Sequence, residues 1–427
     1  MGKSRTMARA GLAAAGVMAA VLPASAYAQD IGAGIVSDSG DTGFLIAAAL
    51  VGLLAVLPGW AMVQAGQHRA IHVPRAFGMM LGIVAIVSAL WLTIGYSLAF
   101  NGASPWLGFG QNAWLANLGN IREATTVPES AFALINLVFA LLPPLIIAGA
   151  LAERVRLGWM LAFAGLWSLI VYAPVAHWVW GGGWLGANGT LDFAGGLTVW
   201  LPAGVSALVA AVMLGRRTGW PESPLPGHAP MLSLAGAGLS WIGWMALAGG
   251  AALAATDDAS SAIINMHLGA CGGVIAWLIV SRLIGGAVDL AGSGRGALAG
   301  IAALASASGY VAPGPALLIG LIGALLAWLV ARSIERTFRI DDVTGSFAIG
   351  AVAGGTGALL LAVFQSPALG GVGYGEGLDM GRQAFAQIVG IGAITLWSMI
   401  GTLIAGYGVA MVLPMRVSAD EEAQPDI

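Results

Sequence analysis

The sequence predicts an all-α polytopic membrane protein with eleven transmembrane helices. Of its 427 residues, 58% are hydrophobic and only 9% are charged. A soluble protein carries about 25% charged residues, so this composition excludes the ordinary soluble classes. The apolar runs reach the roughly 20 residues that a helix needs to cross a bilayer, and most of the few charges fall between those runs. No basic patch indicates binding to nucleic acid.

The first 28 residues have the pattern of a secretory signal peptide. Three basic residues before position 10 precede a short apolar run over residues 12–22, and residues 26–28 fit the small-x-small pattern of a cleavage site. A first transmembrane helix is the alternative interpretation, which the shortness of the apolar run disfavours. We therefore expect three parts: a signal peptide over 1–28, a membrane domain over 29–416 and a short cytoplasmic tail over 417–427.

Eleven apolar segments follow the signal. They lie near residues 43–66, 76–100, 129–151, 157–179, 197–215, 229–254, 261–281, 296–311, 314–331, 345–365 and 386–413. If the mature N-terminus is outside, twelve of the 17 Lys and Arg residues lie in predicted cytoplasmic loops, two lie outside and three lie in the signal. Positive residues favour cytoplasmic loops, so this distribution supports the topology. We expect a bacterial-type inner (plasma) membrane protein with its N-terminus outside and its C-terminus in the cytoplasm.

The eleven segments divide into five, five and one. Because each half has an odd number of segments, the second half is inverted relative to the first, as in transporters whose site lies near the membrane midplane. The symmetry of the sequence is faint: Asp192 precedes the fifth segment, and Asp341 and Asp342 precede the tenth. The sequence therefore favours a 5+5 inverted repeat followed by a C-terminal helix.

Seven short blocks stand in an order and at a spacing that resemble the Amt/Mep/Rh ammonium transporter family, from about residue 44 to residue 416. They are LPGWA (57–61), LWLTIGYSLAF (90–100), GALAER (149–154), AHWVWGGG (176–183), LDFAGG (191–196), RIDD (339–342) and MRVS (415–418). The resemblance implies a homotrimer of eleven-helix subunits, each with its own pore. It also implies an outer aromatic site that gathers ammonium, two phenylalanines that close the entrance, and paired histidines along an apolar lumen.

Four residues stand where this family has its outer mouth. Trp180 takes the place of the cation-binding tryptophan, whose ring face attracts a cation by about 0.5–2 kcal/mol; the alternative is a tryptophan of the interfacial belt. Asp192 takes the place of the carboxylate that supports the site from behind, and it is also placed to cap the next helix. Phe139 takes the place of the inner phenylalanine of the gate, and Ile135 stands where the outer one would be.

Four departures from the family concern its ion path. The two lumen histidines of the family fall on Trp200 and Gly350, so both are absent here. Leu247 replaces a further phenylalanine, and Ala251 replaces a serine that contacts the ion. One hypothesis is that Trp200 fills the space of two imidazoles, because Gly350 removes a side chain from the facing helix, and so plugs or narrows the pore. The alternative is that the residues at these two positions drifted because the pore is no longer required to function.

No cofactor, metal site or catalytic set is expected. The chain has no nucleotide motif and no Ser-His-Asp set, and its single cysteine excludes a cysteine-based metal cluster. His68 and His72 have i, i+4 spacing but fall in a predicted loop, and His177 is expected to be packed and hydrogen-bonded. His267 lies inside the seventh segment, where an ionisable residue is a functional candidate, although it matches no lumen position of the family.

Three functions remain open from the sequence. The first, favoured by the resemblance and by Trp180, is transport of ammonium or ammonia across the membrane. The second is a non-conducting sensor or scaffold that binds ammonium at the mouth and signals to a cytoplasmic regulatory partner. The third is a pore for another small neutral solute, which an apolar lumen without histidines would suit. An enzyme is not expected.

Overall fold

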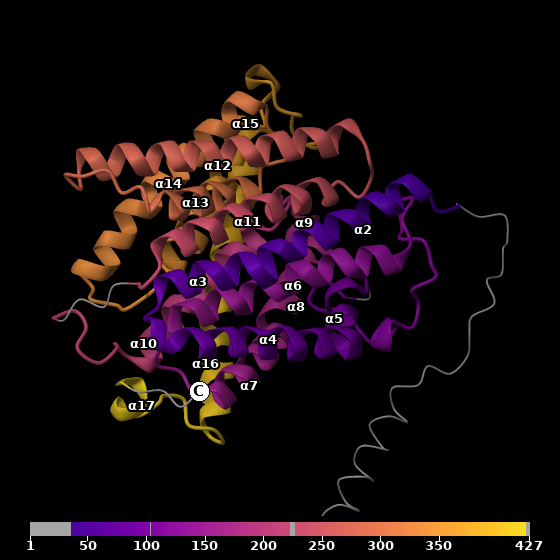
Figure 1. Ribbon diagram of the computed structural model, residues 1–427. Helices are drawn as coiled ribbons and strands as arrows, with labels where there is room; N and C mark the ends of the chain where they lie inside the picture. Colours follow the sequence, from indigo (N-terminus) through magenta and orange to yellow (C-terminus); the bar gives the residue numbers. More distant parts are fainter. Residues whose placement is uncertain (1–35, 103, 223–226, 424–427) are drawn as a thin grey trace, which may run out of the picture. The chain divides into compact units, whose positions relative to one another are not determined.

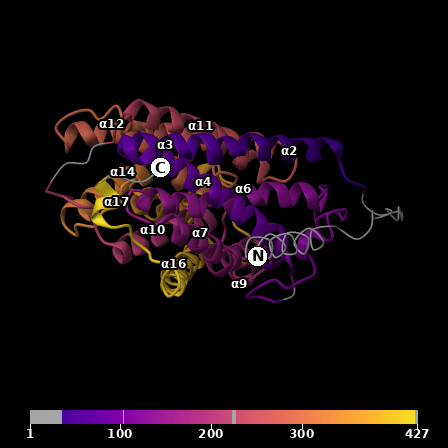
Figure 2. The ribbon, with the colours of Figure 1, turned by 60° about the horizontal axis from the view of Figure 1, so that its bottom comes forward.

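The computed structural model describes residues 36–427 apart from 103, 223–226 and 424–427, and the part described is all-helical, without strands. The signal peptide expected over residues 1–28 lies outside the described residues. Figure 1 shows a bundle in which α2 (Ser39–Leu54), α11 (Pro230–Gly250) and α12 (Asp257–Leu283) lie side by side. Figure 2 shows the same three helices together along one side of the bundle.

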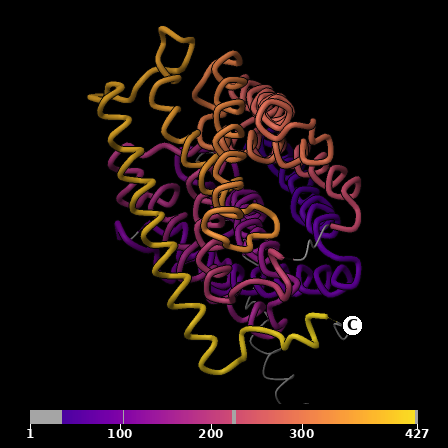
Figure 3. Tube along the Cα trace, turned by 90° about the vertical axis from the view of Figure 1, so that its left-hand side faces the viewer, coloured from indigo at the N-terminus to yellow at the C-terminus, as the bar shows by residue number. Residues whose placement is uncertain are grey.

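The remaining helices complete the bundle. They are α3 (Ala61–Gln67), α4 (Val73–Leu90), α5 (Tyr96–Phe100), α6 (Glu129–Leu151), α7 (Leu157–Trp167), α8 (Ala173–Trp180), α9 (Trp184–Ala187), α10 (Leu201–Leu214), α13 (Ser293–Ala305), α14 (Pro313–Arg336), α15 (Gly354–Phe364), α16 (Met380–Ala410) and α17 (Ala419–Ala423). Short 3₁₀ turns lie at Ala70–His72, Ala113–Leu115 and Pro367–Leu369. Figure 3 shows α16, in yellow, running along one edge of the bundle.

Five π-helical segments interrupt or precede these α-helices. They are Ala55–Trp60, Trp91–Gly95, Ser168–Tyr172, Gly196–Trp200 and Phe347–Ala353. A π-helical turn inserts an extra residue into the helical ladder and often marks a functional position. Trp60 and Trp200 both lie in such segments, and their rings meet inside the protein at a centroid distance of 6.2 Å.

Ten helical segments of the described part are long and apolar enough to cross a membrane. This agrees with the polytopic, all-α prediction, but the expected count of eleven is not confirmed. The segment expected over 296–311 is α13, which has only 13 residues and is buried along almost its whole length. A non-helical stretch at membrane depth is tolerated where protein covers it. Here Asn265 donates to the carbonyls of Ser308 and Val311 at 2.8 and 2.7 Å, which satisfies the backbone beyond α13.

Two carboxylates cap equivalent helices in the two halves of the chain. Asp192 accepts backbone N–H groups at the start of Gly196–Trp200, which continues into α10. Asp342 accepts the N–H groups of Ser346 and Phe347 at 3.0 and 2.8 Å, at the start of the segment that continues into α15. A carboxylate therefore caps the start of both the fifth and the tenth expected span. This agreement supports the inverted repeat, for which the sequence symmetry was faint.

A buried charge network joins the loops at the end of the bundle where α6 ends. Glu153 pairs with Arg69 at 2.8 Å and with Arg217 at 3.5 Å. Arg217 in turn pairs with Asp341 at 2.9 Å, and Asp341 also lies 3.7 Å from Arg154. Burial alone would raise the pKa of the Glu153 carboxyl, but its hydrogen bond to a histidine and the nearby arginine hold that pKa below its usual range. The GALAER and RIDD blocks therefore meet in one structural cluster.

The α6 helix links this cluster to the opposite end of the bundle. It is the most enclosed of the ten spans. Its last turn leads into Glu153 and Arg154, whereas its first turns carry Phe132, Ile135 and Phe139, which line the pocket described next.

Candidate mouth and lumen

A small pocket opens beside the first turns of α6. Its volume is about 140 Å³. It is lined by Phe132, Ile135, Asn136, Phe139, Trp180, Phe193, Gly250, Ala251 and Leu253. Six residues were expected to contact the substrate, at the mouth or along the ion path, and four of them lie together here: Ile135, Phe139, Trp180 and Ala251. We call this cavity the mouth pocket.

Trp180 closes the end of α8 and presents its ring to the mouth pocket. Its indole Nε1–H donates to the backbone carbonyl of Asp192 at 2.6 Å, which fixes the orientation of the ring. Its ring centroid lies 5.3 Å from that of Phe139, at an interplanar angle of 56°. Because the N–H group is already bonded, what Trp180 offers the pocket is an aromatic face.

Asp192 lies behind the mouth pocket and does not line it. Its carboxylate is buried and accepts the backbone N–H groups of residues 195–198 and the hydroxyls of Thr198 and Ser306, all within 2.8–3.1 Å. Burial raises the pKa of this carboxyl, and the hydrogen bonds that it accepts act in the opposite direction. Asp192 thus caps the start of the helix through its carboxylate and holds the Trp180 indole through its backbone carbonyl.

Of the expected pair of gate phenylalanines, only Phe139 stands at its position in the mouth pocket, and Ile135 stands at the other. Phe139 is 3% exposed and lies between Trp180 and Trp244. Ile135 packs against Gly250, where an added Cβ would meet Ile135 Cδ1 at 2.3 Å. The second gate position is therefore a tightly packed aliphatic contact.

Leu247 lies away from the mouth pocket. It is fully buried, and its Cδ2 would be 2.7 Å from a Cβ added at Gly52 of α2. Leu247 thus packs into the notch that this glycine leaves, whereas Ala251, one turn later, reaches the pocket wall. Among the six assigned residues, Asp192 and Leu247 are the two that do not line the cavity.

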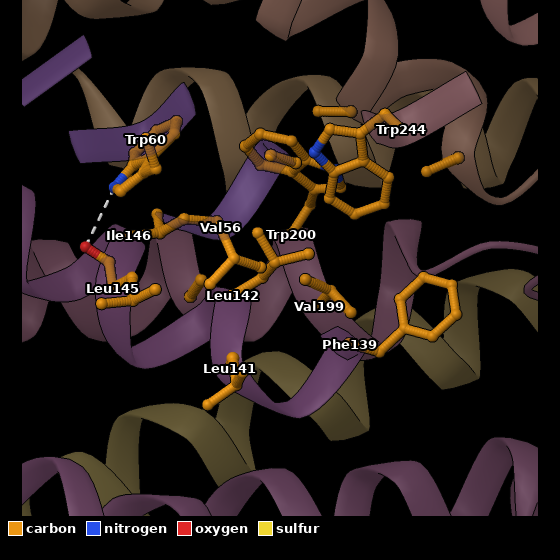
Figure 4. Close-up of a cluster of buried hydrophobic side chains, with 14 of the residues drawn as sticks. Val56, Trp60, Phe139, Leu141, Leu142, Leu145, Ile146, Val199, Trp200 and Trp244 are labelled. Carbon is orange, nitrogen blue, oxygen red and sulfur yellow. Dashed lines mark hydrogen bonds between the residues drawn. The ribbon is translucent and has the colours of Figure 1, made fainter. Parts of the chain in front are cut away.

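Next to Phe139 the interior of the protein is filled by tryptophan rings, among them Trp244, Trp200 and Trp60 (Figure 4). Trp200 stacks on Trp244 with centroids 5.1 Å apart and packs edge-on against Trp60 at 6.2 Å. Trp200 is fully buried, and Trp60 and Trp244 are 2% and 1% exposed. With Trp180 at the top, these rings form a continuous aromatic column from the mouth pocket into the core.

The indole N–H of Trp200 is a fully buried donor that has no hydrogen-bond partner within the described part of the chain. Trp60 Nε1 donates to the Leu145 carbonyl at 3.0 Å, as the dashed line in Figure 4 marks. Trp200 Nε1 is buried and finds no hydrogen-bond partner among the described residues. Leaving a buried donor unpaired costs about 1–3 kcal/mol, so this N–H is poised to bind an acceptor that enters the lumen.

Gly350 does not face the ring of Trp200, which corrects the hypothesis of a direct exchange of volume. A Cβ at Gly350 would lie 2.6 Å from the backbone oxygen of Trp200 and 3.2 Å from the Cα of Gly204. A Cβ at Gly204 would in turn lie 2.3 Å from the backbone nitrogen of Ala351. Two helices of opposite halves therefore cross on paired glycines, as small residues allow in membranes, and position 350 has no space for a side chain.

Three of the residues that the sequence prediction did not assign bear on the chemistry of the site: Asn136, Trp60 and Trp244. Asn136 lines the mouth pocket, and its Nδ2 donates to the Phe132 carbonyl at 3.0 Å, which leaves Oδ1 as an acceptor on the wall. The sequence feature that could have singled out Asn136 is its polar amide within an otherwise apolar span. For Trp60 and Trp244 the sequence shows only that the residues are aromatic. Their contact with Trp200 joins distant parts of the chain, so no local pattern indicates it.

The histidines lie outside the mouth and the column. His177 has each ring nitrogen near a carbonyl, Nδ1 at 3.0 Å from Ala99 and Nε2 at 2.6 Å from Ser104, which confirms its packed and hydrogen-bonded state. His267 is exposed on α12, with its ring 5.2 Å from that of Trp241. Within the described residues, no group of three or more His, Cys, Asp or Glu side chains could hold a metal ion.

Comparison with known proteins gives a consistent set of relatives. Residues 43–427 match the model of the Ammonium Transporter Family. The chain is 35% identical to an ammonium transporter of Bacillus subtilis over 389 residues, which cover 90% of this chain and 95% of the relative. It is 33% identical to an ammonium transporter of Aquifex aeolicus over 417 residues, which cover 96% of each.

Solved structures agree with these relatives. A structure described as a sensor Amt protein superposes with a TM-score of 0.84 at 26% identity and covers 90% of this chain and 96% of its own. Mep2 of Saccharomyces cerevisiae superposes with a TM-score of 0.81 at 27% identity and covers 90% of both chains.

Proposed function

The chain belongs to the ammonium transporter family, and we propose that it transports ammonium across the membrane by first recruiting the cation in the mouth pocket around Trp180. The observation that carries this proposal is the fixed ring of Trp180 beside Phe139, 5.3 Å apart, on a cavity of about 140 Å³. Ammonium leaving water is attracted to aromatic faces by about 0.5–2 kcal/mol.

Asn136 adds a hydrogen-bond acceptor to these faces. Ammonium has four N–H donors, and the Oδ1 of Asn136 is an acceptor on the pocket wall. The carboxylate of Asp192 is already saturated by its own helix start, so it supports the mouth without contacting the ion. Recruitment is thus assigned to rings and an amide rather than to a formal negative charge.

Beyond the mouth pocket, the uncharged form is the species that fits the aromatic column. A full charge at the centre of a bilayer costs at least a few kcal/mol, and positions 200 and 350 carry no histidine to relay a proton. Ammonia has a lone pair that can accept the unpaired Nε1–H of Trp200, whereas ammonium has none. We assign Trp200 the role of a barrier that ammonia passes when the ring moves.

We also propose an assembly and a placement for the protein, which the family membership and the charge distribution support. The mouth pocket faces the outside, and the arginine-rich end, with Glu153 and Arg217, faces the cytoplasm. The N-terminus lies outside, the C-terminus lies in the cytoplasm of a bacterial-type inner membrane, and three copies form a homotrimer. A cytoplasmic regulatory partner would meet the same arginine-rich face.

A non-conducting sensor is the second candidate, because Trp200 is fully buried within an unbroken stack of rings. In that case the mouth pocket binds ammonium and the signal passes to a cytoplasmic partner. A pore for another neutral solute is the third candidate, since the column has no charged side chain among its rings.

Flux and binding measured together separate these candidates. Purified protein in proteoliposomes is given an ammonium gradient, and uptake is followed beside protein-free liposomes and a Trp180→Leu variant. Transport predicts uptake above the protein-free control, with a higher half-saturating concentration for Trp180→Leu. Ammonium binding to the folded protein without uptake would establish the sensor, and permeability to an uncharged solute without ammonium uptake would establish the third function.

A further inference from the structure

A fixed positive charge lies beside the mouth pocket. The guanidinium of Arg122, in the loop between α5 and α6, lies over the ring of Phe132, with its Cζ 4.4 Å from the ring centroid. Phe132 also lines the mouth pocket, so one ring contacts both the guanidinium and the cavity. Building on the proposed function, we propose that Arg122 is a positioning residue that lowers the affinity of the mouth pocket for ammonium.

The place that holds the guanidinium has the components of a cation site. The rings of Phe100 and Phe132 meet edge to face, 4.9 Å apart, and Arg122 lies against both. Its Nη1 lies 3.3 Å from Oε1 of Glu129, a carboxylate that also accepts the hydroxyl of Tyr96. The same Nη1 donates to the Phe100 carbonyl at 3.4 Å. Aromatic faces beside a carboxylate attract any small cation, and here a side chain of the protein itself occupies them.

Backbone hydrogen bonds keep Arg122 in this position. Its N–H donates to the Val127 carbonyl at 2.9 Å, and its own carbonyl accepts the N–H and the hydroxyl of Thr125 at 3.1 and 2.8 Å. The N–H of Glu129 donates to the Asn120 carbonyl at 2.8 Å, which ties the start of α6 to the same loop. The Arg122 side chain is only 23% exposed. Its charge is therefore fixed, and water screens it less than it screens a fully exposed arginine.

Two opposite charges thus stand behind Phe132, and their balance sets how tightly the mouth pocket holds a cation. The carboxylate of Glu129 attracts ammonium, whereas the guanidinium of Arg122 repels it and covers part of the ring that ammonium could use. The pair is neutral as a whole, which agrees with recruitment by rings and an amide. Without Arg122 the carboxylate would act alone, and ammonium would leave the mouth pocket more slowly.

Ammonium binding by charge variants tests the role of Arg122. Isothermal titration of the full-length, detergent-solubilised protein with ammonium chloride should give about tenfold tighter binding for Arg122→Gln and about tenfold weaker binding for Glu129→Gln. Arg122→Lys keeps the charge, so its affinity should stay close to that of wild type. Arg382→Gln is the matched control, because it removes an exposed arginine of the expected outer side that does not line the mouth pocket, and it should leave the affinity unchanged.

Uptake rates distinguish a charge effect from a structural one. If Arg122→Gln stabilises only the bound cation, the half-saturating concentration and the maximal rate of uptake by proteoliposomes should fall together by about tenfold, with their ratio unchanged. A variant that is merely damaged would lose maximal rate without gaining affinity. Glu129→Gln changes the affinity in the opposite direction, so the test does not depend on one variant folding.

The outcomes separate the role of Arg122 from the proposed function. If Trp180→Leu weakens binding while Arg122→Gln and Glu129→Gln bind ammonium as wild type does, Arg122 has no such role and recruitment at Trp180 still stands. If Arg122→Lys binds as tightly as Arg122→Gln, the charge is not the cause and the proposal is overturned. If wild type binds no ammonium, both the proposed function and the role of Arg122 are overturned.

Discussion

Trp200 and Trp244 stack with their ring centroids 5.1 Å apart and their planes inclined by 28°, directly inward of Phe139. The pair comes from two different halves of the chain. Trp200 stands at one of the two positions where the family resemblance implied a histidine. We propose that the behaviour of the lumen depends on whether these rings separate.

Replacing Trp200 by alanine should open the lumen. The indole is fully buried against Trp244 and Trp60, and its removal leaves a cavity in the column. We expect ammonium uptake by proteoliposomes to rise about tenfold, which corresponds to a barrier lower by about 1.4 kcal/mol.

Trp159→Ala is the matched control for this loss of a ring. Trp159 is equally buried but packs on Phe163 of α7, outside the column. Both substitutions should lower stability by about 3–5 kcal/mol, yet only Trp200→Ala should raise uptake. Equal uptake by the two variants would mean that Trp200 is not the barrier.

Gly350→Ala should destabilise the protein, although it adds only a methyl group. That methyl would lie 2.6 Å from the Trp200 carbonyl, which is backbone and cannot rotate away. Overpacking of this kind costs about 1–3 kcal/mol. The thermal unfolding temperature of Gly355→Ala, where the nearest atoms are 3.9 and 4.0 Å from the new Cβ, should be close to that of wild type.

The double change Trp200→His/Gly350→His should consequently fail to restore a histidine-lined pore. An imidazole at position 350 has no space unless the two crossing helices separate. Size-exclusion profiles and uptake measured on the double variant and on Trp200→His alone would show whether position 350 is the cause. A well-folded double variant with high uptake would contradict this prediction.

Asp192→Ala should be the most damaging single change at the mouth. It leaves four backbone N–H groups and two hydroxyls without their acceptor, and each buried donor left unpaired costs about 1–3 kcal/mol. Asp342→Ala frees two backbone N–H groups and should lower the unfolding temperature less. Asp192→Asn, which keeps one acceptor oxygen, should fall between Asp192→Ala and wild type. The reverse order would argue against the capping role.

Trp180 should affect affinity more than it affects stability. Trp180→Leu removes the aromatic face from a partly exposed position, so ammonium binding should weaken about 2- to 30-fold, as a cation–π energy of about 0.5–2 kcal/mol implies. Trp180→Phe keeps a ring but loses the hydrogen bond to Asp192, and it should weaken binding less. Isothermal titration of the detergent-solubilised protein gives both values. Identical affinities for the two variants would exclude a cation–π contribution.

Stability should fall at acid pH through Glu153. The pKa of its carboxyl is lowered in the folded protein, so its contribution is present above the unfolded value near 4.5 and is lost as the pH falls below that value. The unfolding temperature of wild type should therefore change little between pH 7 and about 5 and should decline as the pH is lowered further, from about 5 toward 2. Glu153→Gln should be less stable at pH 7, because Arg69 and Arg217 lose their partner, and should show a flatter acid limb.

The sequence by itself determined the class of the protein. A long apolar run with few charges is stable in lipid as a helix. The arginines between the runs marked the ends of these helices. The blocks around Trp180, Asp192 and Glu153 identified the family and most of the mouth. These signals are local, because a cap, a motif or a span lies within a few neighbouring residues.

Only the tertiary structure decided what fills the lumen. Trp60, Trp200 and Trp244 are far apart in the chain, and no periodicity indicates that their rings meet. The pairing of Trp200 with Gly350 in the sequence suggested an exchange of volume, yet the glycine meets the backbone of residue 200 and not its ring. The physical reason is that the way two helices cross decides which residues of each helix face the interior. The sizes of the side chains at positions 200 and 350 do not decide it.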